Sequence, residues 1–321
     1  MLNLGKKFII LAVSLVVIGA LIFVIAASSV GWDFTKLGTV KHETNTHEID
    51  EAVNSISIKT DTADIDFLPS DDGKIKVVCY EEENMKHSVS VLDGDLKIEV
   101  VDTRKWYEHI SWYSSPRITV YLPEGEYSSL FIDEGTGDID VANNFKFESV
   151  DIKASTGDVE LYSSAESVKI KTRTGNIRVE NITANSLDLS VSTGKVTVVG
   201  AACEGDLNIK VSTGKTYLTD TKCKNLISTG NTGDMKLKGT IATEKFSIER
   251  STGDVKFEGC DAAEIYVITD TGDVEGTLLS DKIFLANSDT GDIDVPKTIS
   301  GGRCEITTDT GDIKLSVKPQ S

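Results

Sequence analysis

The stretch VDIKASTGDVEL, residues 150–161, contains two short strand patterns separated by one turn. Apolar side chains alternate with polar ones before the turn, at Val150 and Ile152, and again after it, at Val159 and Leu161. Such alternation is typical of strands with one buried face. Between the two halves stands a Thr-Gly pair, and glycine favours a tight reversal of the chain. The stretch therefore predicts a strand, a turn and a second strand.

The same pattern recurs along most of the chain. Thr-Gly pairs begin at residues 136, 156, 174, 193, 213, 232, 252, 271, 290 and 310, at intervals of 18 to 20 residues. The residue six before each Thr is apolar in all ten copies. The residue four before and the residue five after are apolar in nine of ten, with Ser228 and Gly276 as the exceptions. This regularity identifies a repeat protein.

A repeat of this length predicts an all-β, single-stranded β-solenoid of about ten coils. One unit cannot bury its apolar face alone, whereas stacked coils bury a continuous core. Stacking places equal positions of successive repeats in ladders about 4.8 Å apart, so ten coils make a rod about 48 Å long. An antiparallel meander of hairpins is the structural alternative. The equality of positions across ten repeats favours the solenoid, because stacking requires like residues at equal offsets.

Four regions follow from the pattern. Residues 1–30 are expected to form a transmembrane anchor, 31–52 a polar juxtamembrane linker, 53–130 a β cap, and 131–321 the Thr-Gly-Asp solenoid. Solenoids need terminal caps to cover the exposed core and strand edge. Within the expected cap, Thr62-Ala63-Asp64 resembles a degenerate copy of the repeated turn.

The N-terminus contains an uncharged run over residues 8–27, preceded by Lys6 and Lys7. Twenty residues at about 1.5 Å each span about 30 Å, the thickness of a bilayer core. The flanking lysines favour a cytoplasmic N-terminus and an extracytoplasmic solenoid on a single-pass protein. A cleaved signal peptide is the alternative, with Ala26, Ala27 and Ser28 as the cleavage site, but signal sequences have shorter apolar runs.

Composition excludes several function classes. The chain of 321 residues carries 33 Lys+Arg against 51 Asp+Glu, a net charge of −18, which argues against a nucleic-acid partner. It has four His, and none lies beyond His109. No catalytic triad or phosphate-binding loop is present, and the short repeat intervals leave no room for loops that build a cleft. We therefore expect a protein that is not an enzyme. A glycan hydrolase is a remote alternative.

The acidic residues at the turns are the first candidate site. In the last three repeats, Asp occurs both before the Thr and after the Gly, and stacking would align these carboxylates in two rows. Hard cations such as Ca²⁺ would relieve their repulsion. The simpler interpretation, which we favour, is that these side chains bond turn amides and face water. The candidate calcium ligands are Asp270, Asp273, Asp289, Asp292, Asp309 and Asp312.

Two further groups of residues, one aromatic and one of cysteines, are candidate sites. Trp106, Tyr107, Trp112 and Tyr113 lie close together in sequence, where they stack on sugar rings, lie at a membrane interface or pack over the end of the core. Packing is the favoured interpretation. Cys203 and Cys223 both follow their Thr by ten residues, which places them on adjacent coils. They form either a disulfide or small buried corners, and we favour the corners.

The chain resembles a known family in three features. These are the Thr-Gly-Asp-Ile/Val turns, the segment from Ile56 to Ile65, and the strand Ile118-Thr-Val120-Tyr-Leu122-Pro123. They are similar to the bacterial "putative adhesin" β-strand-repeat family, also called toastrack. The resemblance covers residues 53–318 and implies a membrane-anchored extracytoplasmic β-solenoid, often associated with envelope stress in Gram-positive bacteria. It implies no catalytic residues and no required cofactor.

The leading functional hypothesis is a non-enzymatic scaffold in the bacterial envelope, attached to the membrane by its N-terminal helix and binding protein partners. A surface adhesin that binds polysaccharide or protein ligands is the alternative.

Overall fold

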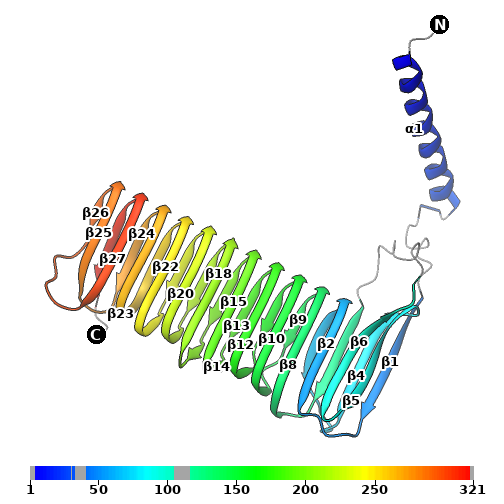
Figure 1. Ribbon diagram of the computed structural model, residues 1–321, viewed down its shortest axis with the longest axis horizontal. Coiled ribbons are helices and arrows are strands. Elements are labelled where there is room, and N and C mark those ends of the chain that lie inside the picture. Colours follow the sequence, from blue (N-terminus) through cyan, green and yellow to red (C-terminus); the bar gives the residue numbers. More distant parts are fainter. Residues whose placement is uncertain (1–3, 30, 33–40, 105–115, 319–321) are drawn as a thin grey trace.

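The computed structural model describes residues 4–29, 31–32, 41–104 and 116–318. One apolar helix, α1 (Leu4–Ser29), precedes an all-β rod. The rod in Figure 1 is a β-solenoid of about ten turns, as the repeat predicts. The helix includes a stretch, Lys6–Ser29, long and apolar enough to cross a membrane, a property that signal sequences share.

Two walls of parallel strands form the rod. The first wall contains the strands that lead into the Thr-Gly turns, and its members are β8 (Gly125–Thr136), β10 (Phe145–Thr156), β12 (Ser164–Thr174), β15 (Ser186–Thr193), β18 (Asp206–Thr213), β20 (Lys222–Thr232), β22 (Ile241–Thr252), β23 (Val255–Thr271), β25 (Lys282–Thr290) and β27 (Gly302–Thr310). Strand β23 is long because it passes from the second wall around a corner into the first.

The second wall contains the strands that leave the turns, and its members are β9 (Ile139–Val141), β11 (Val159–Leu161), β13 (Ile177–Glu180), β16 (Val196–Val199), β19 (Thr216–Thr219), β21 (Met235–Lys238), the start of β23, β24 (Val274–Leu278), β26 (Ile293–Asp294) and β28 (Ile313–Val317). Two short corner strands are β14 (Thr183–Ala184) and β17 (Ala202–Cys203). Pairing is parallel and mostly in register, with register shifts at the corners between β20, β22, β23 and β24; Thr156, for example, lies between Thr136 and Thr174. The apolar columns of the repeat fill the core.

The N-terminal end continues both walls and then closes them. Its strands are β1 (His42–Ile49), β2 (Ser55–Thr62), β3 (Asp64–Pro69), β4 (Ile75–Glu82), β5 (Met85–Leu92), β6 (Asp95–Asp102) and β7 (Arg117–Leu122). Strands β2 and β3 pair in parallel with β8 and β9, so they form a coil of the rod, and Thr62 aligns with Thr136. Thr62-Ala63-Asp64 is thus a true, degenerate turn. Antiparallel strands β5, β4 and β1 finish the two walls.

One region differs from the predicted boundaries. Strand β1, His42–Ile49, lies within residues 31–52, which we expected to be a linker. Its side chains alternate between exposed and half-buried up to the buried Ile49, because successive side chains point to opposite faces of a strand, and among the described strands it pairs with β4 alone. A polar composition is suitable for such an edge, which explains why the segment reads as a linker.

The last two coils are stacked in reverse order. Strand β27 pairs with β23 on one side and with β25 on the other. Strand β28 likewise lies between β24 and β26. The final repeat is therefore inserted between two earlier ones, and the coil of residues 282–294 forms the end of the rod (Figure 1).

A buried cation explains an exception in the apolar columns. Arg250 is only 4% exposed, and burial lowers its pKa to about 10, so it stays charged at neutral pH. Its Nη2 donates to Ser228 Oγ at 2.8 Å and to Thr216 Oγ1 at 3.3 Å. Gly230 provides the space for the guanidinium group, because a Cβ there would lie 2.6 Å from Arg250 Nη1. The polar residues of two columns thus surround one guanidinium group.

Turn glycines are required because the coils touch there. Gly214 has a φ of 141°, and a Cβ on it would lie 1.6 Å from the carbonyl oxygen of Gly194. No side chain fits at this distance.

We expect Gly214→Ala to destabilise the protein by about 3 kcal/mol, because it adds both a steric clash and backbone strain. Thermal unfolding followed by circular dichroism measures the effect. Gly125→Ala is the matched control, since nothing lies within 4 Å of a Cβ at Gly125. Equal melting temperatures for the two variants would contradict this role for the turn.

Candidate functional site

The turn aspartates form a ladder of side chain to backbone hydrogen bonds. Oδ1 of Asp273 accepts the Asp312 amide at 2.8 Å, and Oδ1 of Asp312 accepts the Asp292 amide at 2.8 Å. Oδ1 of Asp254 accepts the amide of Asp273 at 2.9 Å. The order of the ladder follows the inserted coil rather than the sequence. Each of these carboxylates satisfies an amide of the neighbouring coil, which agrees with the simpler interpretation of the turn.

The proposed calcium ligands do not converge on one point. Asp312 forms an ion pair with Lys314 at 2.5 Å, and this contact together with the Asp292 amide lowers its pKa. Asp270, Asp289 and Asp309 are exposed on the other side of the Thr-Gly pairs. Among the described residues, no three of the six aspartates bring ligand oxygens within 4.8 Å of one another.

Calcium binding at these turns stays a prediction with a direct test. If the rows bind Ca²⁺, millimolar Ca²⁺ should raise the melting temperature, because a ligand that binds only the native state stabilises it. The variant Asp273→Asn should reduce the shift, whereas Asp138→Asn at the opposite end of the ladder should retain it. An unchanged melting temperature in the wild-type protein excludes the site.

The two cysteines of the predicted pair lie on adjacent coils. Ala202 pairs with Lys222, which places Cys203 beside Cys223. Both are free and buried in the structure. Burial, together with Cys203 and Asp206, raises the pKa of Cys223 to about 12. A thiol of this kind is unreactive, so the corner interpretation fits, and the disulfide stays a prediction.

The aromatic candidates Trp106, Tyr107, Trp112 and Tyr113 lie outside the described residues.

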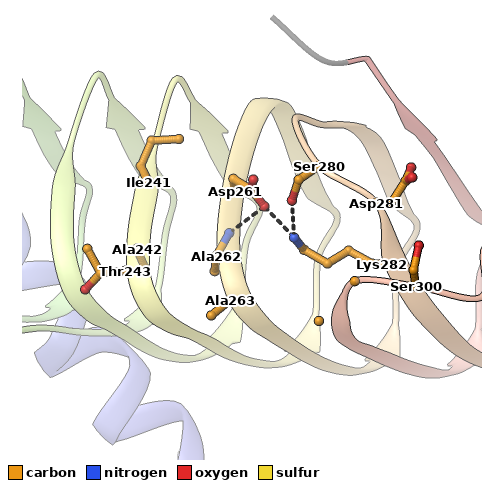
Figure 2. Close-up of a pocket in the computed structure, with 12 residues that line it drawn as sticks. Ile241, Ala242, Thr243, Asp261, Ala262, Ala263, Ser280, Asp281, Lys282 and Ser300 are labelled. Atoms are coloured by element: carbon orange, nitrogen blue, oxygen red, sulfur yellow. Dashed lines mark hydrogen bonds and ion pairs between the residues drawn. The ribbon is translucent and has the colours of Figure 1, made fainter.

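An open groove with a mixed polar and apolar lining lies at the end of the rod opposite the cap. It encloses about 630 Å³ and opens where the inserted coil enters, between β23, the segment before β25 and the segment before β27 (Figure 2). Its lining is made mostly of small and polar residues, which are Ile241, Ala242, Thr243, Asp261, Ala262, Ala263, Ser280, Asp281, Lys282, Ser300, Gly301 and Gly302. Close packing of the inserted strand requires the glycines, since a Cβ on Gly302 would lie 1.7 Å from the Ala263 carbonyl oxygen.

Lys282 is the central charged group of the groove. Its Nζ lies 2.6 Å from Asp261 Oδ1 and 2.5 Å from Ser280 Oγ, and its side chain is 3% exposed. As Figure 2 shows, this ion pair extends from the terminal coil to β23, beyond the inserted strand. Lys282 is thus a structural clamp. Ser280 Oγ accepts from Lys282 and keeps its own O–H as a donor, so it and the hydroxyls of Ser300 and Thr243 are the hydrogen-bonding groups for a polar ligand.

Glu134 is a buried acid near the first turns. It is 2% exposed; its Oε1 accepts the amides of Ala63 at 3.2 Å and Thr136 at 2.9 Å, and its Oε2 has no partner. Burial raises the pKa of this carboxyl to about 8, and Asp61 and Asp64 add to the effect. At neutral pH the group is therefore mostly a neutral acid.

This pKa predicts how stability depends on pH. The folded value of about 8 exceeds the unfolded value of about 4.5, so the stability from Glu134 is full below about pH 4.5 and is lost as pH rises through about 8. Glu134→Gln should therefore melt at a higher temperature than the wild type above pH 8, and the gain should shrink toward pH 4.5. Glu148→Gln, an exposed control, should follow the wild type throughout. A constant difference between Glu134→Gln and wild type would contradict the assignment.

Sequence reasoning missed several groups. The groove escaped notice because it arises from the reversed order of the last coils. Sequence reasoning also missed the cluster of Cys79, Glu81 and His87 in the cap, where the irregular strand spacing hides which residues meet. The visible signal was the alternation of Cys79 and Glu81 on the inward face of one strand.

A comparison with known families agrees with the fold. Residues 53–215 and 201–321 match the model of the family described as Toastrack DUF4097. Similar solved structures include a "putative adhesin" from Parabacteroides distasonis, with 13% identity, a TM-score of 0.45, and coverage of 74% of this chain and 98% of that one.

Two further structures are comparable. A "putative lipid binding protein" from the same species has 19% identity, a TM-score of 0.46 and coverage of 74% and 98%. A "putative adhesin" from Parabacteroides merdae has 12% identity, a TM-score of 0.41 and coverage of 88% and 98%. No curated protein matches the chain.

Proposed function

Because the chain belongs to the Toastrack DUF4097 family, we propose that it is a non-enzymatic, membrane-anchored extracytoplasmic scaffold in bacterial envelope homeostasis or stress response. In this proposal α1 stays in the membrane with Lys6 and Lys7 on the cytoplasmic side. The rod then lies outside the cytoplasm and binds envelope proteins.

The position of the groove carries the proposal. It lies at the end of the rod opposite the cap, and the cap is the part of the rod that follows the helix. The groove is lined by the seventh to the tenth coils, so about six coils of about 4.8 Å hold it roughly 29 Å from the cap. A rigid rod between an anchor and an open groove is suited to presenting a binding site away from the membrane surface.

The chemistry of the described residues supports binding rather than catalysis. Lys282, the buried cation of the groove, is neutralised by Asp261, and the groove contains no His or Cys to act with the serines. The turns repeat one environment along the rod, whereas a catalytic site needs groups with distinct environments.

A photo-crosslinking residue in place of Asp281 tests the proposal in the full-length, membrane-inserted protein. We expect it to capture specific envelope proteins, because Asp281 lines the groove. The same residue in place of Asp188, exposed in the middle of the rod, is the matched control. Equal products from the two positions would show that the groove is not the binding site.

An adhesin that binds polysaccharide is the second candidate. The hydroxyls of Ser280, Ser300 and Thr243 favour it, since sugar hydroxyls exchange hydrogen bonds with such groups. The full-length protein should then sediment with isolated cell-wall polysaccharide, and Ser300→Trp should abolish this by filling the groove. If the Ser300→Trp variant still sediments with the polysaccharide, or if the wild type does not, the result counts against this candidate.

A further inference from the structure

Three metal-ligating side chains of different kinds meet inside the cap. Cys79 and Glu81 lie on β4 and His87 lies on β5, and one ligand atom from each lies within 4.8 Å of the other two. All three residues are buried. Within the part of the chain that the structure describes, this is the one group of His, Cys and acidic residues with such spacing.

The two strands that supply these residues belong to opposite walls of the rod. Strand β4 pairs with β7 and β1 in the second wall, whereas β5 pairs with β6 in the first. Their only paired residues are Glu82 and Met85, at the tight connection between them. The three side chains therefore meet across the interior where the two walls converge.

The acid and the imidazole are already in contact. Oε2 of Glu81 lies 2.9 Å from Nδ1 of His87 and accepts the His87 backbone amide at 2.6 Å. The side chains of His87 and Glu81 are 0% and 1% exposed. Each polar atom of the two side chains has a hydrogen-bond partner, as buried polar groups require, and an ion between Nδ1 and Oε2 would replace the contact that joins them.

A second layer of polar residues holds the two ligands in place. Thr60 Oγ1 lies 2.9 Å from Nε2 of His87, the ring nitrogen that faces away from Glu81. Asn45 Nδ2 donates to Oε1 of Glu81 at 2.7 Å, which leaves Oε2 directed toward the cluster. Orientation of a ligating His by a partner on its other nitrogen, and of a carboxylate by a hydrogen bond, is usual around bound metals.

We propose that Cys79, Glu81 and His87 form a binding site for a zinc-class divalent cation, with Nδ1 as the His87 ligand atom. Zinc takes sulfur, imidazole nitrogen and carboxylate oxygen together, whereas Ca²⁺ and Mg²⁺ prefer oxygen alone. Three protein ligands leave the fourth tetrahedral position for water. The charges of a thiolate and a carboxylate balance those of the ion.

Zinc binding changes the protons on Cys79 and His87. Burial, with the nearby Glu81, raises the pKa of the Cys79 thiol to about 12, so the thiol is protonated when no metal is bound. Zinc takes the place of this proton, which leaves to solvent as the Zn–S bond forms. At His87, Nδ1 must be unprotonated to bind the ion, and Nε2–H then donates to Thr60 Oγ1.

The site would stabilise the cap by linking its two walls. Zinc bound only by the folded chain contributes its binding free energy to folding. Strand β1, the first strand after α1 in the chain, lies over the cluster through Asn45, the register partner of Cys79. The ion would therefore strengthen the end of the rod nearest the anchor.

Full-length protein in detergent, freed of metal by a chelator, provides the test with Zn²⁺ and Co²⁺ as probes. We expect one ion per chain, a thiolate-to-cobalt charge-transfer band and a zinc-dependent rise in melting temperature. Cys79→Ala should lose all three. The matched control is Cys304→Ala, a buried thiol in the rod outside the cluster, and it should retain them. Thr60→Val should weaken zinc binding by about 10- to 100-fold, because it removes only the partner of the His87 ring.

X-ray absorption fine structure, measured at the zinc edge on the zinc-loaded wild-type protein, provides a test that does not depend on how the variants fold. One sulfur at about 2.3 Å with nitrogen and oxygen at about 2.0–2.2 Å supports the site. A shell without sulfur, no binding to the wild type, or undiminished binding to a folded Cys79→Ala variant would overturn it.

Discussion

The closeness of successive backbones at the turns determines the rest of the rod. A Cβ on Gly157 would lie 1.8 Å from the carbonyl oxygen of Gly137, and the contact repeats from turn to turn. Because no side chain can stand between the coils there, each coil must stack directly on the last. Equal positions then meet equal positions, which aligns the apolar columns, the Thr ladder and the turn aspartates. One backbone contact thus produces the whole arrangement.

Stacking of like residues also sets the electrostatics. A turn carboxylate is tolerated beside another because it accepts an amide of the next coil, as Asp138 does from Asp158 at 2.8 Å. Inside the core no such compensation is regular, so buried ionisable residues of the repeats, such as Glu134 and Arg250, are special cases. Glu134 takes up a proton, and Arg250 is surrounded by the hydroxyls of Thr216 and Ser228 and by the space at Gly230, which the two preceding coils supply.

The sequence predicts the repeats well because stacking demands equality at equal offsets. It predicted the solenoid and its columns, and even the degenerate turn at Thr62 was visible. It could not predict the order of the last two coils, because the repeats at Thr290 and Thr310 have the same pattern and fill the columns in either order. The cap cluster was hidden for a different reason. Thr60, Cys79 and His87 come from three strands whose approach depends on the irregular region, where no period relates one strand to the next.

The reversed coils have a consequence for how the chain reaches its final form. A solenoid with strictly sequential coils can grow as it is synthesised, each new coil adding to a finished edge. Here β27 and β28, which follow the coil of residues 282–294 in the chain, occupy a layer between that coil and β23 and β24. The coil of residues 282–294 must therefore wait apart from β23, or release it again, until β27 and β28 have been made and have entered. The order of assembly at this end of the rod thus differs from the order of synthesis, which separates it in time from assembly of the other coils.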